Sequence, residues 1–184
     1  MPDPGPALAP WAAFYTIVGS AAAALTGLMF VVITLVTGER NFSTRDGIAT
    51  FSTPTVLHFS AALLVALLLG APWHSFVAPS VLIGIVGLYG IVHIVQVMLR
   101  TRRLHSYEPD VEDWVCYTIL PFAAYLTILA GAAALLVMAE KALFVIASGT
   151  ALLVFVGIRN SWDTVTFIAI DTGETKASEA KHDS

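Results

Sequence analysis

The chain alternates long apolar runs with short polar segments. Five runs contain no Asp, Glu, Lys or Arg, and they cover residues 11–38, 54–71, 76–99, 114–138 and 142–158. Because an α-helix rises 1.5 Å per residue, about 20 apolar residues cross the hydrocarbon core of a bilayer. The first, third and fourth runs are long enough alone, whereas the second and fifth are marginal. We expect the second run to gain length before Pro54 and the fifth to extend toward Ile170.

The segments between the runs differ in their content of basic residues. Eight of the nine fall on one side if the runs cross a membrane alternately: Arg40, Arg45, Arg100, Arg102, Arg103, Arg159, Lys176 and Lys181. Lys141 is the ninth and falls on the other side. Cytoplasmic loops are enriched in Lys and Arg, so this asymmetry predicts five spans with the N-terminus outside and the C-terminus in the cytoplasm.

Composition agrees with a membrane-embedded chain. Hydrophobic residues make up 57% of the 184 residues and charged residues 12%, against about 25% charged in soluble domains. We therefore expect an all-α polytopic membrane helix bundle, in which residues 1–170 form one transmembrane domain and residues 171–184 form a disordered cytoplasmic tail. The net charge of −4 gives no reason to expect nucleic-acid binding.

Short connections and small residues indicate how the helices pack. Residues 72–75 and 139–141 are so short that each joins two antiparallel neighbours, which gives two hairpins and one further helix. Small residues let helices approach closely in lipid. They recur in the first and third runs as Gly19, Ala23, Gly27, Gly84, Gly87 and Gly90. We expect these two seams to serve packing within the chain, with homo-oligomerisation as the alternative.

Two histidines lie within the apolar runs, where ionisable side chains are costly. At helical pitch, His93 shares a stripe with Tyr89, Gln96 and Arg100, and His58 lies in the preceding run. These five residues are a candidate polar cavity open to the cytoplasm. The favoured interpretation is hydrogen bonding between helices. The alternatives are a pH-responsive group or ion path and, more remotely, ligation of a b-type haem.

A second polar cluster follows the fifth run. It consists of Arg159, Asn160, Trp162 and Asp163, and the spacing of four places the charges of Arg159 and Asp163 on one helical face. We expect this cluster at the cytoplasmic interface. Local pairing is the favoured interpretation, and docking with another helix bundle is the alternative.

No motif for catalysis, phosphate binding or metal binding occurs in the sequence, so no cofactor is expected and nothing nominates an enzyme. The segments FYTIVGSAAAALTGLMFVVITL and GIRNSWDTVTFIAI resemble a loosely defined set of small, uncharacterised bacterial multi-pass inner-membrane proteins, some with names that suggest modulation of a membrane-bound protease. The resemblance implies a bacterial plasma membrane and a regulatory role. We expect a non-enzymatic partner or regulator of other membrane proteins, with a small channel or proton-responsive transport component as the alternative.

Overall fold

The computed structural model describes residues 4–38, 45–101 and 114–182, and no β-strand occurs in these ranges. The elements in chain order are α1 (Gly5–Leu8), the 3₁₀-helix η1 (Ala9–Trp11), α2 (Ala12–Gly38), α3 (Arg45–Gly70), α4 (Val77–Thr101), the π-helix η2 (Val115–Ile119), α6 (Leu120–Ala134) and α7 (Ala139–His182). The five apolar runs thus correspond to five long helical stretches, as predicted.

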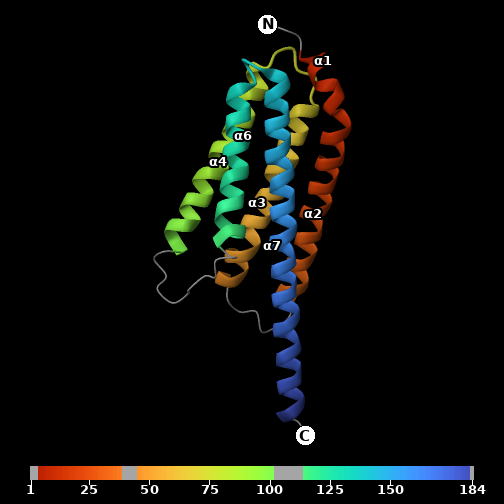
Figure 1. Ribbon diagram of the computed structural model, residues 1–184. Coiled ribbons are helices and arrows are strands. Elements are labelled where there is room, and N and C mark those ends of the chain that lie inside the picture. Colours follow the sequence, from red (N-terminus) through yellow and green to blue (C-terminus); the bar gives the residue numbers. More distant parts are fainter. Residues whose placement is uncertain (1–3, 39–44, 102–113, 183–184) are drawn as a thin grey trace.

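The long helices lie side by side in one bundle with two distinct ends (Figure 1). At one end lie the N-terminus and the short connections from α3 to α4 and from α6 to α7; we call it the hairpin end. At the opposite end α7 continues toward the C-terminus beyond the other helices; we call it the tail end. The chain therefore enters and leaves the bundle at opposite ends.

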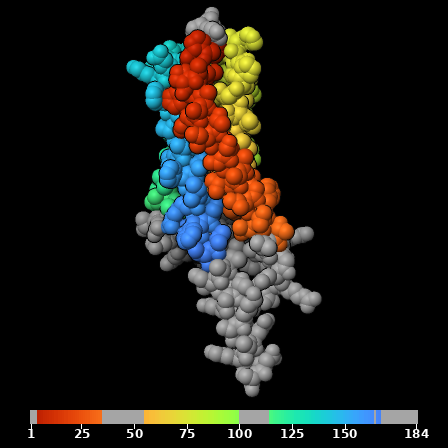
Figure 2. Space-filling model, turned by 90° about the vertical axis from the view of Figure 1, so that its right-hand side faces the viewer, coloured from red at the N-terminus to blue at the C-terminus, as the bar shows by residue number. Residues whose placement is uncertain are grey.

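Helix α3 lies between α2 and α7. It packs against α2 on one side and α7 on another, and the face of the molecule in Figure 2 shows α2 running across the bundle beside α7. Helix α4 lies at the edge and packs mainly on α6, with fewer contacts to α3. The α6–α7 pair is therefore a close hairpin as predicted, whereas α3 and α4 are joined by a short connection but pack chiefly on other helices.

The packed face of α7 repeats every seven residues. Its buried positions alternate in steps of four and three: Ala142, Ile146, Gly149, Leu153, Val156 and Asn160. This is the pattern of left-handed helix packing, in which one seam faces the neighbouring helices along its whole length. Asn160 is thus the position of this seam nearest the tail end.

The outward surface is apolar. Four helical stretches are long and apolar enough to cross a membrane, namely Gly5–Thr34, Val77–Leu99, Val115–Ala134 and Ala139–Asp163, and Thr55–Gly70 is a shorter apolar helix. Large apolar side chains are exposed on several of these helices, among them Ile17, Leu67, Ile85, Leu126 and Phe155. A soluble protein does not expose apolar side chains so extensively, so the chain is a membrane protein built as a helix bundle.

Two local features have causes in the sequence. Pro121 has no N–H to donate, and the turn before it widens into the π-helix η2. Helix α7 continues through His182, whereas we expected disorder beyond residue 170. Residues 171–184 contain no apolar residue larger than Ala, but they include Ala177, Glu179 and Ala180, which favour helix formation. A segment without a hydrophobic core can therefore still be helical.

Candidate functional site

A buried hydrogen bond joins α3 to α6 near the middle of the bundle. His58 Nδ1 and Tyr125 Oη lie 3.0 Å apart, and the exposed fraction of both residues is 0%. The Nε2 atom of His58 is also buried and has no hydrogen-bond partner in the described chain. A polar side chain in an apolar interior is costly unless it is hydrogen-bonded, so Tyr125 compensates one of the two ring nitrogens of His58.

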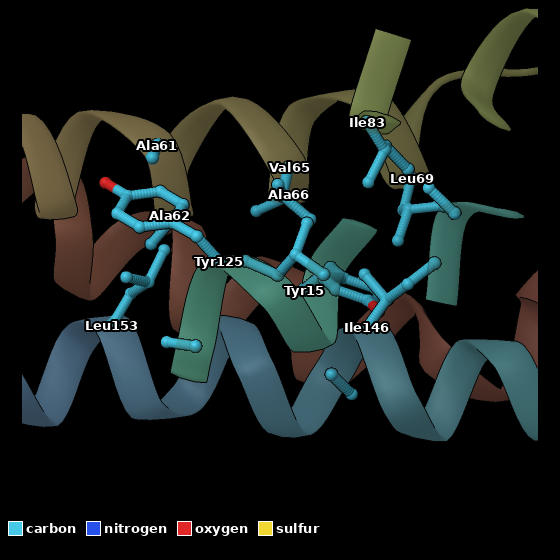
Figure 3. Packing of buried hydrophobic residues seen from close by; sticks show 14 of the residues in the cluster. Tyr15, Ala61, Ala62, Val65, Ala66, Leu69, Ile83, Tyr125, Ile146 and Leu153 are labelled. Atoms are coloured by element: carbon cyan, nitrogen blue, oxygen red, sulfur yellow. The ribbon is translucent and has the colours of Figure 1, made fainter. Parts of the chain in front are cut away.

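Tyr125 is held between helices by its ring. A Cβ atom added at Gly90 of α4 would overlap the Tyr125 ring, so the ring lies directly against the α4 backbone. Figure 3 shows the same side chain reaching from α6 along the space between α3 and α7, with its hydroxyl toward the tail end. Because helical side chains lean toward the N-terminus of their helix, this direction follows from α6 running from the tail end to the hairpin end.

His93 of α4 brings a second imidazole to this region. Its ring stacks on that of Tyr89 with a centroid distance of 6.4 Å. His93 is about four residues farther from the α3–α4 connection than His58 is, so helical rise alone places its Cα about 6 Å farther along the bundle. The opposite directions of α3 and α4 reduce this offset, because His58 leans toward the tail end and His93 toward the hairpin end.

The residues of the predicted polar cavity do not line one cavity. His58 is enclosed in the packed core, His93 is half-buried, and Tyr89 and Gln96 are exposed on the outer side of α4. The side chain of Arg100 lies outside the described residues. A haem bridging His58 and His93 would have to displace Tyr125, which packs against both α3 and α4, so the geometry does not suit the haem interpretation.

Two further buried polar residues lie on the tail side of His58. Thr55 precedes His58 by one turn of α3, and its exposed fraction is 0%. On α7, a Cβ atom added at Gly157 would approach the Phe59 ring to 2.5 Å, which places Gly157 beside Phe59. Asn160, also fully buried, is one turn farther toward the tail end. Thr55, His58 and Asn160 are thus three buried polar side chains on this part of α3 and α7.

The predicted cluster at the end of the fifth run divides into inward and outward parts. Arg159 Nη1 and Asp163 Oδ1 are 3.1 Å apart in a partly exposed ion pair, which is the local pairing that the spacing of four predicts. Asn160 faces the core, whereas Trp162 is 66% exposed. The four residues therefore form no single site, although Trp162 and the ion pair share the outer surface of α7.

The glycines of α4 form a seam with α6. A Cβ atom added at Gly87 would lie 3.0 Å from the backbone nitrogen of Leu129, and Gly90 faces Tyr125 as described above. Gly84 is less crowded, because its added Cβ would meet Ala132 at an ordinary 3.9 Å. The predicted glycine seam of α4 is therefore a packing surface within the chain.

The small residues of α2 separate into two faces. An added Cβ at Gly19 would lie 3.1 Å from Ala66 of α3, but Gly27 has nothing within 4 Å and Ala23 is exposed. The buried face of α2 instead continues from Gly19 through Ala22 to Met29. Residues spaced by alternating steps of three and four stay on one face of a helix, whereas residues spaced only by four move gradually around it. The exposed small residues form a separate strip, which we call the α2 outer face: Thr16, Ser20, Ala23, Gly27 and Thr34.

Sequence reasoning missed Tyr125 and the glycines of the α6–α7 hairpin. An added Cβ at Gly149 would lie 2.9 Å from the carbonyl oxygen of Ala124, and one at Gly131 would lie 3.2 Å from that of Ala142. The short connection already indicated that these two helices are neighbours, so glycines on both could have been assigned to the contact. Tyr125 had a weaker signal, because its run also contains the hydroxyls of Tyr117, Thr118 and Thr127.

The described residues contain no group of three or more His, Cys, Asp or Glu side chains arranged to hold a metal ion. Comparisons of the chain with protein-family models, with curated proteins and with solved structures gave no match.

Proposed function

We propose that the chain is a non-enzymatic, five-span protein of a bacterial plasma membrane that acts as a partner or regulator of other membrane proteins. The observation that carries this proposal is the α2 outer face. Its members are exposed and carry no charge, and they are small from Thr16 to Gly27, about three helical turns, with the exposed Phe30 on the same side of α2 before Thr34. In lipid, such a strip is a contact surface for another helix, because small side chains allow close approach of the two backbones.

The number of spans rests on the position of α3. The apolar part of α3, Thr55–Gly70, is shorter than a typical span, and α3 packs against the longer apolar helices α2 and α7. The whole helix, Arg45–Gly70, has 26 residues, which is long enough to cross a bilayer. Counting α3, the chain crosses five times, which agrees with termini at opposite ends of the bundle (Figure 1).

The orientation rests on charge. At the hairpin end the described residues have one basic side chain, Lys141, in the first turn of α7. The other eight Lys and Arg lie in the sequence between α2 and α3, around the end of α4, or from Arg159 onward. Basic residues are retained on the cytoplasmic side, so the tail end is cytoplasmic and the hairpin end is outside.

The α2 outer face can be tested with a photocrosslinking amino acid placed at Ala23 or Gly27, with Leu28 as the matched control. Leu28 is also exposed, but at helical pitch it lies about 100° around α2 from Gly27. We expect a discrete crosslinked product from positions 23 and 27 in native membranes, absent at position 28 and lost in Gly27→Leu, because a large side chain blocks close approach.

The outcomes of this experiment separate the alternatives. A product whose mass matches another membrane protein supports the partner function, and reciprocal purification of that protein must then recover this chain. A product of twice the mass of this chain assigns the face to homo-oligomerisation. Equal labelling at positions 23, 27 and 28, or no product at all, contradicts the proposal.

A small channel or proton-responsive transport component is the second candidate, and the buried polar residues on the tail side of the bundle favour it. Thr55, His58 and Asn160 come from two helices and are fully buried. Reconstitution into liposomes with measurement of ion flux under a pH gradient tests this function.

A further inference from the structure

Helix α4 has one face that no other described helix covers. Gly87 and Gly90 lie against α6, and an exposed set of residues occupies the opposite side of α4: Ile85, Leu88, Tyr89, Val92, Gln96 and Leu99. At helical pitch these residues fall within about 100° of one another, and we call them the α4 outer face. Figure 1 shows α4 at the edge of the bundle, so this face is open to lipid or to another molecule.

Two polar side chains lie on the α4 outer face within the apolar span Val77–Leu99. Tyr89 is 60% exposed, and at 1.5 Å per residue it lies about 15 Å from Leu99 and about 18 Å from Val77. Its hydroxyl is therefore near the middle of the span, where lipid offers no hydrogen-bond partner. Gln96 is also exposed, about one turn inside Leu99.

The described part of the chain compensates neither group. The ring of Tyr89 stacks on His93, but its hydroxyl makes no hydrogen bond with the described residues, and the amide of Gln96 makes none either. The exposed hydroxyls of Thr16 and Thr34 on α2 differ, because each donates to a backbone carbonyl of its own helix at 2.8 Å. A polar group in an apolar environment is costly without a hydrogen bond, so Tyr89 and Gln96 favour a partner outside the single chain.

The chemistry of these two groups indicates which partner fits. A phenol hydroxyl and a primary amide both donate and accept hydrogen bonds, so each can pair with a copy of itself. Residues 77–99 contain no Asp, Glu, Lys or Arg, so α4 carries no charge there that would repel its own copy or require an opposite charge. All copies of one chain insert in the same orientation. A two-fold axis normal to the membrane therefore brings equal residues together at equal depth.

We propose that the α4 outer face binds a second copy of this chain in a two-fold symmetric dimer. Each Tyr89 then meets the Tyr89 of the other copy, and each Gln96 meets the other Gln96. The apolar members Ile85, Leu88, Val92 and Leu99 follow one another in steps of three, four and seven, the spacing of left-handed helix packing. This pattern lets the two α4 helices pack along most of the span.

The dimer goes beyond the partner function and does not depend on it. The α2 outer face lies on a different helix, and α2 and α4 stand at opposite edges of the bundle in Figure 1. Helix α2 packs on α3 and α7, whereas α4 packs mainly on α6. One chain can therefore bind its own copy through α4 and another membrane protein through α2.

Disulfide crosslinking in native membranes tests the geometry of the dimer. In a Cys116→Ser background, Leu88→Cys and Val92→Cys place single thiols at the centre of the α4 outer face. Phe155→Cys is the matched control, because Phe155 is 73% exposed but lies on α7. With a membrane-permeant oxidant we expect a product of twice the chain mass from positions 88 and 92, since equal residues meet at the axis, and none from position 155.

Energy transfer between dye-labelled full-length chains in liposomes measures the strength of the association as the protein-to-lipid ratio is varied. Tyr89→Phe keeps the ring that stacks on His93 and removes only an exposed hydroxyl, so the single chain keeps its fold. We expect it to weaken dimerisation about 3- to 10-fold, the equivalent of one hydrogen bond. Gln96→Leu should act in the same direction, whereas Gly27→Leu, on the α2 outer face, should leave the dimer unchanged.

Four results would overturn the α4 dimer. The first is energy transfer that never exceeds the level of random encounter, and the second is equal disulfide formation at positions 88 and 155. The third is an association weakened by Gly27→Leu but by neither Tyr89→Phe nor Gln96→Leu, which assigns the contact to α2. The fourth is a photocrosslinking amino acid at Val92 that captures another membrane protein in place of a second copy, which assigns the α4 outer face to that protein.

Discussion

At the scale of single residues, the bundle depends on a few polar atoms placed in an apolar interior. His58 illustrates this, because its only hydrogen bond in the described chain is to Tyr125 and both residues are fully buried. The sequence identified His58 by its cost in an apolar run but did not identify its partner. A hydrogen bond between residues 67 positions apart has no local signature, whereas the cost of burying a histidine does.

We expect Tyr125→Phe to lower the free energy of unfolding by about 1 to 2 kcal/mol, because it removes the hydroxyl but keeps the ring that packs on Gly90. Reversible unfolding in mixed detergent micelles measures this change. Tyr89→Phe is the matched control, since Tyr89 is exposed, and it should change stability by less than about 0.5 kcal/mol. Equal effects of the two substitutions would mean that the buried bond does not contribute.

A second prediction at this scale concerns two neighbours on α7. Asn160→Ala should destabilise the protein by about 1 to 2 kcal/mol, because truncation of a fully buried side chain leaves a cavity in the packed seam. Arg159→Gln removes a partly exposed ion pair and should cost less than about 0.5 kcal/mol. Thermal unfolding of both variants checks the order, and a larger loss for Arg159→Gln would contradict the assignment of Asn160 to the core.

At the scale of elements, the sequence predicted the helices well and their faces less well. Five apolar runs became five helical stretches, because about 20 apolar residues without a charge have few other structures in lipid. Each helix is apolar on every side, so hydrophobicity does not distinguish a face toward lipid from a face toward protein. This is why Gly19 packs as predicted while Ala23 and Gly27 do not, and why α4 packs on α6 more than on its hairpin partner α3.

The α4–α6 seam gives a prediction with an internal control on one helix. Gly90→Ala should destabilise the bundle by about 1 to 3 kcal/mol, since the new methyl group would overlap the Tyr125 ring. Gly84→Ala adds the same group where the nearest atom is at an ordinary contact distance, so its cost should be near zero. Chemical unfolding of the two variants in detergent measures the difference, and similar stabilities would contradict the close approach of α4 to Tyr125.

At the scale of the whole molecule, charge and packing give complementary information. The basic residues of the sequence predict which end faces the cytoplasm, and the bundle shows which helices share that end. Locating the residues of the candidate polar cavity required both the sequence pattern and the packing of the helices. Helical periodicity put Tyr89, His93 and Gln96 on one stripe, but the tilt and neighbours of α4 turned that stripe partly to the outer surface, which no local pattern specifies.

The five-span orientation is tested by labelling single cysteines in a Cys116→Ser background. His74→Cys is exposed in the α3–α4 connection at the hairpin end, and Lys176→Cys lies in the part of α7 that continues beyond the bundle. If the hairpin end is outside, a membrane-impermeant maleimide labels position 74 in intact cells and position 176 only after the membrane is permeabilised. Labelling of both positions in intact cells would mean an even number of crossings between them, so that α4, α6 and α7 would not all be spans. The reverse pattern would place the hairpin end in the cytoplasm.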